Sequence, residues 1–239
     1  MSLTEIISNA ISYPFSDIGK FLMVGVLVLL AGLSSFIAPF GIENNSILAL
    51  IIVIIALIFA IVLSGYNVDV IKNGIDNIDE IPSIDFMKNL VNGLKTLVIG
   101  IVYFIIPIII MLILGIITGA IGAGLDHLAA AMGVTSIIAA IVFILFAIFE
   151  IVALARFADT GELGAAFNIG DVVEDAKRVG ILKIIGFLII AFIIALVATF
   201  ISSLFAIIPF VGIIIAVIVL GGFVTLFIYR GFGLLYADA

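Results

Sequence analysis

Glu150 is the side chain best placed to do chemistry in this sequence, because it is a carboxylate inside an otherwise apolar stretch. A carboxylate within a membrane span is unfavourable, so it normally faces other helices and finds a partner there. It either binds an ion or a proton, or it forms a structural ion pair or reaches toward water, and we expect the structural role. The candidate intramembrane polar site is therefore Glu150 with Arg156 and Lys183, and the alternative cationic partners are Lys95 and Arg230.

Two features of the apolar stretch near residues 97–122 concern the shape and packing of its helix. Pro107 removes one helical hydrogen bond and is predicted to kink its helix, either as a hinge or as a static bend, and we expect the static bend. Gly115 and Gly119 form a GxxxG pair, which lets two membrane helices approach closely. The contact lies within the chain or in a dimer, and we expect it within the chain.

The sequence contains no recognisable catalytic or cofactor-binding constellation. Nucleotide-binding, zinc-protease and nucleophile-elbow motifs are all missing. The chain has no cysteine and one histidine, His127, which stands beside Asp126 and falls short of the three or four ligands of a metal site. We therefore expect no enzyme activity, no cofactor and no metal.

The composition assigns the chain to the integral membrane proteins. Hydrophobic residues make up 66% of the 239 positions and charged residues 10%, whereas a soluble domain carries about 25% charged residues. A helix needs about 20 apolar residues to cross the hydrocarbon layer, and the apolar runs lack the alternation of a barrel strand. The sequence predicts an all-α fold with six spans near residues 21–38, 47–66, 97–122, 136–156, 184–205 and 211–229.

All nine Lys and Arg residues fall outside three connections between these spans, at 38–46, 123–136 and 206–211. Cytoplasmic segments of membrane proteins hold the Lys/Arg excess. We therefore predict a multi-pass protein of the cell (plasma) membrane with both termini in the cytoplasm. The net charge of −7 argues against a nucleic-acid partner and against a polybasic lipid-binding patch.

The spans group into three predicted hairpin repeats within one polytopic domain, 1–239: about 1–75, 76–165 and 166–239. An amphipathic segment precedes each hairpin, with Ser2 and Glu5 in capping-box spacing, then Ser83 or Asp85 as a cap, then Asn168. We expect these segments to lie in the headgroup plane. The alternative is that they are the cytoplasmic ends of continuous membrane helices.

Several stretches along the chain together resemble one known family. They are Tyr13-Pro14-Phe15-Ser16-Asp17, Gly65-Tyr66, Glu80-Ile81-Pro82 to Asp85-Phe86, Asn92-Gly93-Leu94-Lys95, Tyr103 with Pro107, Leu163-Gly164-Ala165-Ala166-Phe167 and Arg230-Gly231-Phe232-Gly233-Leu234-Leu235-Tyr236-Ala237. Their order and spacing are similar to those of an archaeal integral membrane family catalogued as domain of unknown function 4013. This family usually has basic residues after Gly-Tyr, where this chain continues with Asn67-Val68-Asp69-Val70. The resemblance implies a membrane fold and no known activity.

The scarcity of polar groups within the spans favours a non-enzymatic membrane module with a structural, assembly or lipid-interacting role. A transporter would normally line its path with several such groups. The alternative is a small ion- or proton-coupled transporter or channel that uses Glu150. The expected partners are the lipid bilayer and a second copy or another membrane protein on the cytoplasmic side.

Overall fold

The computed structural model describes residues 1–38, 41–121, 125–205, 207–208 and 211–238, and every regular element in these ranges is helical. The α-helices are α1 (Leu3–Ser12), α2 (Ile18–Ala31), α3 (Ser46–Ile75), α4 (Phe86–Ile121), α5 (Leu125–Thr160), α6 (Ile169–Val179), α7 (Ile181–Phe205), α8 (Val211–Ala216) and α9 (Gly222–Ala237). Shorter turns are η1 (Tyr13–Ser16), η2 (Leu33–Phe36), η3 (Ile42–Asn44), η4 (Leu163–Phe167) and the π-helical η5 (Val217–Gly221). The all-α prediction is confirmed. Parts of the three predicted outer connections lie outside the described residues.

Five helical stretches are long and apolar enough to cross a membrane, so the chain is a multi-pass membrane protein. They are Ser46–Ile75, Phe86–Thr118, Gly133–Thr160, Ile181–Phe205 and Val211–Ala237. A sixth span arises if the first two helical segments, Leu3–Ser16 and Ile18–Ala31, count as one, although they meet at a bend of 95°.

The first predicted span, residues 21–38, is shorter than expected. Gly32 caps α2 at its C-terminal end, donating its N–H to Val28 and Leu30, and η2 follows. The 14 residues of α2 rise only about 21 Å, against a hydrocarbon layer of about 30 Å.

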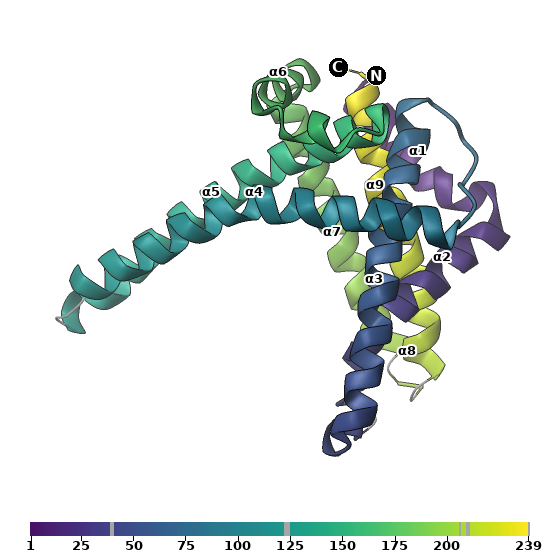
Figure 1. Ribbon diagram of the computed structural model, residues 1–239, viewed down its shortest axis with the longest axis horizontal. Helices are drawn as coiled ribbons and strands as arrows, with labels where there is room; N and C mark the ends of the chain where they lie inside the picture. The colour runs from purple at the N-terminus through teal and green to yellow at the C-terminus, as the bar shows by residue number, and fades with distance from the viewer. Residues whose placement is uncertain (39–40, 122–124, 206, 209–210, 239) are drawn as a thin grey trace.

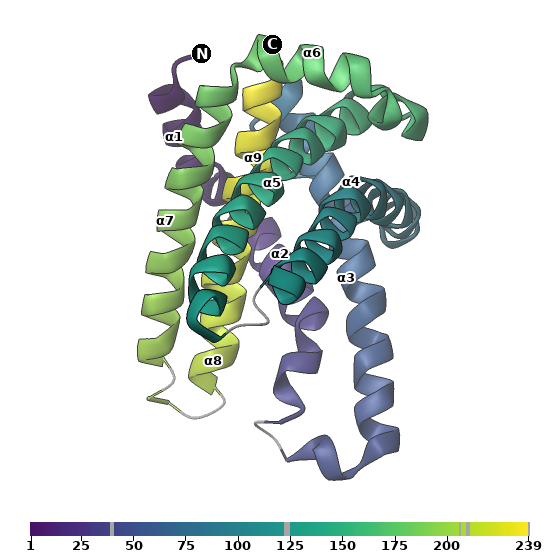
Figure 2. The ribbon, with the colours of Figure 1, turned by 90° about the vertical axis from the view of Figure 1, so that its left-hand side faces the viewer.

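The long helices form a bundle from which one helix pair projects. In Figure 2 α9 lies between α3 and α7, and in both ribbon views the chain termini and α6 lie at the same end of this bundle (Figures 1 and 2). The α4–α5 pair leaves the bundle sideways, with its far end well away from the other helices (Figure 1). Two buried clusters hold the molecule together: the larger joins α1, α6, α7 and α9 to parts of α3, α4 and α5, and the other joins η1, α2 and α3 to α9.

The crossing of α3 and α4 depends on two glycines. A Cβ atom added to Gly65 would lie 1.8 Å from the carbonyl oxygen of Asn89, and one added to Gly93 would lie 1.8 Å from that of Ile61. Small residues are what allow two membrane helices to come this close. By contrast, a Cβ atom on Gly115 would meet nothing within 4 Å among the residues that the structure describes. Close packing through Gly115 and Gly119 therefore stays a prediction.

Gly119 and Pro107 were the other residues predicted to affect the shape and packing of this helix. The surroundings of Gly119 are outside the part of the chain that the structure describes. Pro107 is buried, and α4 continues through it from Phe86 to Ile121. The proposed hinge at Pro107 stays a prediction.

The starts of the helices follow local sequence signals. The capping box of Ser2 and Glu5 is present at α1, which confirms that prediction. The Asp85 carboxylate accepts the Lys88 N–H at the start of α4. However, α4 is one continuous helix, so the described residues contain no separate lead-in helix before the second predicted hairpin, because no proline separates residues 86–96 from the apolar span that follows them.

Candidate functional site

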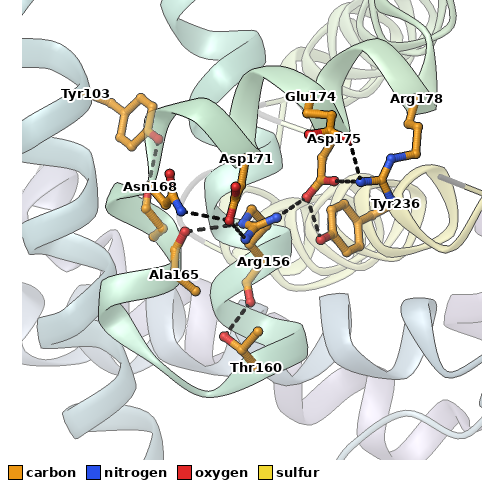
Figure 3. Close-up of polar contacts among 11 residues, drawn as sticks. Tyr103, Arg156, Thr160, Ala165, Asn168, Asp171, Glu174, Asp175, Arg178 and Tyr236 are labelled. Carbon is orange, nitrogen blue, oxygen red and sulfur yellow. Dashed lines mark hydrogen bonds and ion pairs between the residues drawn. The ribbon is translucent and has the colours of Figure 1, made fainter.

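The most connected polar site in the described residues surrounds Arg156, at the end of α5 that lies near the chain termini (Figures 1 and 3). Its Nε donates to the carbonyl oxygen of Ala165 at 3.2 Å, and its Nη2 lies 2.7 Å from Asp171 Oδ2. Its Nη1 pairs with the carboxylate of Asp175. One guanidinium therefore joins α5 to η4 and to α6.

Asp175 is the acceptor at the centre of this site. Its side chain is only 4% exposed, and besides Arg156 it receives the Tyr236 hydroxyl at 2.9 Å and faces Arg178 Nη2 at 3.1 Å. Tyr236 belongs to α9, so the carboxylate joins α6 to the last helix of the chain (Figure 3). Burying a charge is tolerated only when it is paired and hydrogen-bonded, as it is here.

Two further bonds hold the connection between α5 and α6. Tyr103 of α4 donates its hydroxyl to the carbonyl oxygen of Ala166 at 2.7 Å, and Asn168 Nδ2 donates to Asp171 Oδ2 at 2.8 Å (Figure 3). Asn168 is the N-cap residue of α6, as predicted, but its side chain makes no capping bond to the helix backbone. The arrangement is a structural network, with every charged member engaged by another.

Arg230 forms a second network on the other side of α9. Its side chain is fully buried, and it donates to Asn9 Oδ1 at 3.0 Å, to the carbonyl oxygens of Asn73 and Ile78 at 2.8 and 2.5 Å, and to Asp79 Oδ1 at 2.7 Å. The guanidinium also lies over the Tyr13 ring, 4.7 Å from its centroid. One side chain of α9 thus holds α1, η1, the end of α3 and the loop after it.

The structure does not bring Glu150, Arg156 and Lys183 together as one site. Lys183 pairs with Asp238, which also pairs with the N-terminal ammonium of Met1. Hydrogen bonds from Lys183 and then from that ammonium hold the pKa of the Asp238 carboxyl below its usual value.

The two alternative partners of Glu150 are also engaged elsewhere. Arg230 binds Asp79, and Lys95 Nζ lies 5.5 Å from the centroid of the Phe157 ring. The expected ion pair of Glu150 is therefore not made with any described residue. The reason lies in the tertiary structure: acids of loops and helix ends reach Arg156, Lys183 and Arg230, and Lys95 lies against an aromatic ring of α5.

Glu150 instead lies among neutral polar groups where α3, α4, α5 and α9 meet. It interacts electrostatically with the hydroxyls of Tyr103 and Tyr229, and Tyr229 lies beside the side chain of Asn67. Sequence reasoning missed Asn67 and Tyr229 as neighbours of Glu150. The signal available in the sequence was the amide of Asn67, which directly follows Gly65-Tyr66 at the end of an apolar run.

Comparison with known proteins identifies the family of this chain and no activity. The model of a family described as "Protein of unknown function (DUF4013)" matches residues 47–207, which is more than half of the chain. The chain belongs to the DUF4013 family. No curated protein and no solved structure matches it.

The DUF4013 match runs from α3 to α7 and therefore includes Asn67, Glu150 and Arg156. The α9 residues that complete the sites, Tyr229, Arg230 and Tyr236, follow the matched region. Within the described residues no group of three or more His, Cys, Asp and Glu side chains is placed to hold a metal ion.

Proposed function

We propose that this DUF4013 protein is a non-enzymatic, lipid-interacting membrane module that holds acyl chains in grooves between its helices. The observation that supports this most directly is an apolar groove of about 380 Å³ between α2, α3 and the start of α4. Met23, Val26 and Phe59 are among its lining residues, and all of them are apolar. Its volume is in the range of ligand pockets, about 300–1,000 Å³.

A second groove supports the same proposal. It has a volume of about 210 Å³ and lies between α4, α5 and α6, where Ile106, Phe149 and Val173 line it. Both grooves sit beside helices that are long and apolar enough to span a membrane. In that setting the occupant with matching chemistry is a hydrocarbon chain.

The basic residues are poorly placed to select a lipid headgroup. Seven of the nine Lys and Arg side chains pair with acids of this chain: Lys20, Lys72, Lys88, Arg156, Arg178, Lys183 and Arg230. Only the side chains of Lys95 and Lys177 form no ion pair with a described residue. We infer that the groove recognises the acyl chain and is indifferent to headgroup charge.

The proposed setting is the plasma membrane, with both termini in the cytoplasm. The Lys/Arg distribution supports this orientation. Both termini, α1 and α6 gather at one end of the molecule, which is where a protein partner or a second copy would meet it (Figure 2). In this proposal α1 and α6 are the lead-in helices of the first and third hairpin repeats, each with an apolar face toward the bilayer or the bundle.

Phospholipids that carry a photoactivatable group on the acyl chain test whether acyl chains occupy the grooves. In liposomes, we expect crosslinks to concentrate on α2 and α3 beside the larger groove, and to be equal for anionic and zwitterionic headgroups. Val26→Trp fills the groove and is expected to reduce those crosslinks several-fold. Leu196→Trp on the exposed side of α7 is the matched control. Uniform labelling of all exposed apolar surface would contradict the proposal.

The second candidate function is a small ion- or proton-coupled transporter or channel that uses Glu150. The lack of an ion pair at this carboxylate favours it, since intramembrane acids commonly mark ion and proton pathways. Proton or sodium flux into liposomes is then expected, and Glu150→Gln should abolish it, because the amide carries no charge and takes up no proton. Flux that is unchanged in Glu150→Gln would exclude this function.

A further inference from the structure

Glu150 is the one carboxylate of the described spans that lacks both a hydrogen bond and an ion pair with described residues. The other span acids are engaged: Asp69 accepts bonds from Asn89 and from Lys88, and Asp159 accepts one from Lys72. Leaving a carboxylate unpaired in a water-poor setting is costly. Something absent from the chain itself is therefore expected to neutralise Glu150.

Asn67 shows the complementary anomaly on α3. The residue is only 6% exposed, and its Oδ1 is buried and accepts no hydrogen bond in the described part of the chain. A buried acceptor without a donor costs about 1–3 kcal/mol. Such an atom is uncommon in native structures and calls for a specific explanation, such as a bound ion.

Both anomalies involve the hydroxyl of Tyr229 on α9. The hydroxyl of Tyr229 lies beside the Asn67 side chain and within electrostatic reach of Glu150. On the α4 side Gly100 packs against the carboxylate, because an added Cβ atom would be in van der Waals contact with Glu150 Oε1 at 3.5 Å. Tyr229 of α9 therefore connects the Asn67 amide of α3 to the Glu150 carboxylate of α5.

We propose that Glu150, Asn67 and Tyr229 form a binding site for one small monovalent cation, either H⁺ or Na⁺. The carboxylate supplies the single negative charge, and the Asn67 carbonyl and Tyr229 hydroxyl oxygens supply neutral contacts. Occupancy by either cation makes the cluster neutral and gives the unpaired oxygens a partner. Oxygen atoms are the ligands that hard cations prefer.

No cation of the chain competes for this position among the described residues. The groups that face Glu150 from the neighbouring helices are the hydroxyls of Tyr103 and Tyr229, both neutral. The nearest basic residue along α5, Arg156, is occupied by Asp171 and Asp175. None of the three site residues lines the lipid grooves, although Tyr103 borders both the smaller groove and Glu150. Transport through Glu150 would need this site, but the site can exist without transport.

Carbodiimide labelling tests the site without any assumption about transport. Dicyclohexylcarbodiimide reacts with protonated carboxyls in apolar surroundings, and mass spectrometry of the protein in liposomes locates the adduct. We expect one adduct on Glu150 that decreases as the pH rises and disappears in Glu150→Gln. Protection by Na⁺ at constant pH would identify sodium as the ligand, and pH dependence without sodium protection would identify the proton. Absence of labelling at Glu150 at every pH would overturn the proposal.

Variants of the two neutral residues test whether the three side chains act together. Asn67→Leu and the milder Tyr229→Phe, which keeps the ring packing, are each expected to shift the pH midpoint of labelling or to weaken sodium protection about tenfold. Thr199→Val, on the exposed side of α7, is the control. A wild-type profile in both neutral variants would overturn the three-residue site. Labelling without any flux would leave the site intact and reject transport.

Discussion

Arg230→Met is expected to destabilise the folded protein by about 2 kcal/mol, because two partly buried acceptors lose their donor and the loss at a fully buried acceptor would cost about 1–3 kcal/mol. The acceptors are Asn9 Oδ1 and the Ile78 carbonyl oxygen; the Asn73 carbonyl keeps the N–H of Ile78 as a second donor. Asp79 contributes little to this cost, since its side chain is 77% exposed and stays hydrated. The measurement is the free energy of unfolding in detergent micelles.

The matched control for Arg230 is Arg178→Met. Arg178 is 56% exposed, and its ion pairs are partly solvated, so the expected loss is within about 1 kcal/mol. Arg230→Lys should recover only part of the stability, because an ammonium group cannot reproduce the planar fork that reaches four acceptors. Equal stability of Arg230→Met and Arg178→Met would contradict the role assigned to Arg230.

Arg156→Met is expected to cost about 2–4 kcal/mol, the range for removing one partner of a buried or partly buried ion pair. The side chain of Arg156 is 16% exposed and that of Asp175 is 4% exposed, so water replaces little of the lost interaction. Asp175 keeps Tyr236 and Arg178, which is why a complete loss of folding is not expected. Proteolysis between α5 and α6 should also accelerate, since the guanidinium joins those helices.

A double-mutant cycle separates the ion pair from general damage at this site. Asp175→Asn combined with Arg156→Met should cost less than the sum of the single changes, because both remove the same interaction. Lys177→Met is the control, since Lys177 is exposed on the same helix and forms no ion pair with described residues. Strict additivity of the two changes would show that Arg156 and Asp175 are not coupled.

Local features of the molecule could be predicted from short segments of sequence. The capping box at Ser2 and Glu5 and the cap at Asp85 involve residues three positions apart, so the backbone near them suffices. The end of α2 at Ala31 was missed because an apolar run continues beyond Gly32. Hydropathy measures how apolar a segment is and does not report where its helix stops.

The charge partners could not be predicted, because distance in the chain says nothing about which acid reaches which cation. Arg230 and Asp79 are separated by 151 positions, and Lys183 and Asp238 by 55. Each of these cations had been a candidate partner for Glu150. That Glu150 has no ion pair becomes clear only when the contact of each nearby cation is known from the tertiary structure.

The sequence by itself determined that this is a helical, multi-pass membrane protein, because long apolar runs in a bilayer must satisfy their own backbone hydrogen bonds. The tertiary structure decided which residues meet. The close contact at Gly65 and Gly93 determines how α4 crosses α3, and the same folding leaves Glu150 beside Asn67 and Tyr229. Such meetings depend on helix crossings between distant segments, which no local pattern encodes.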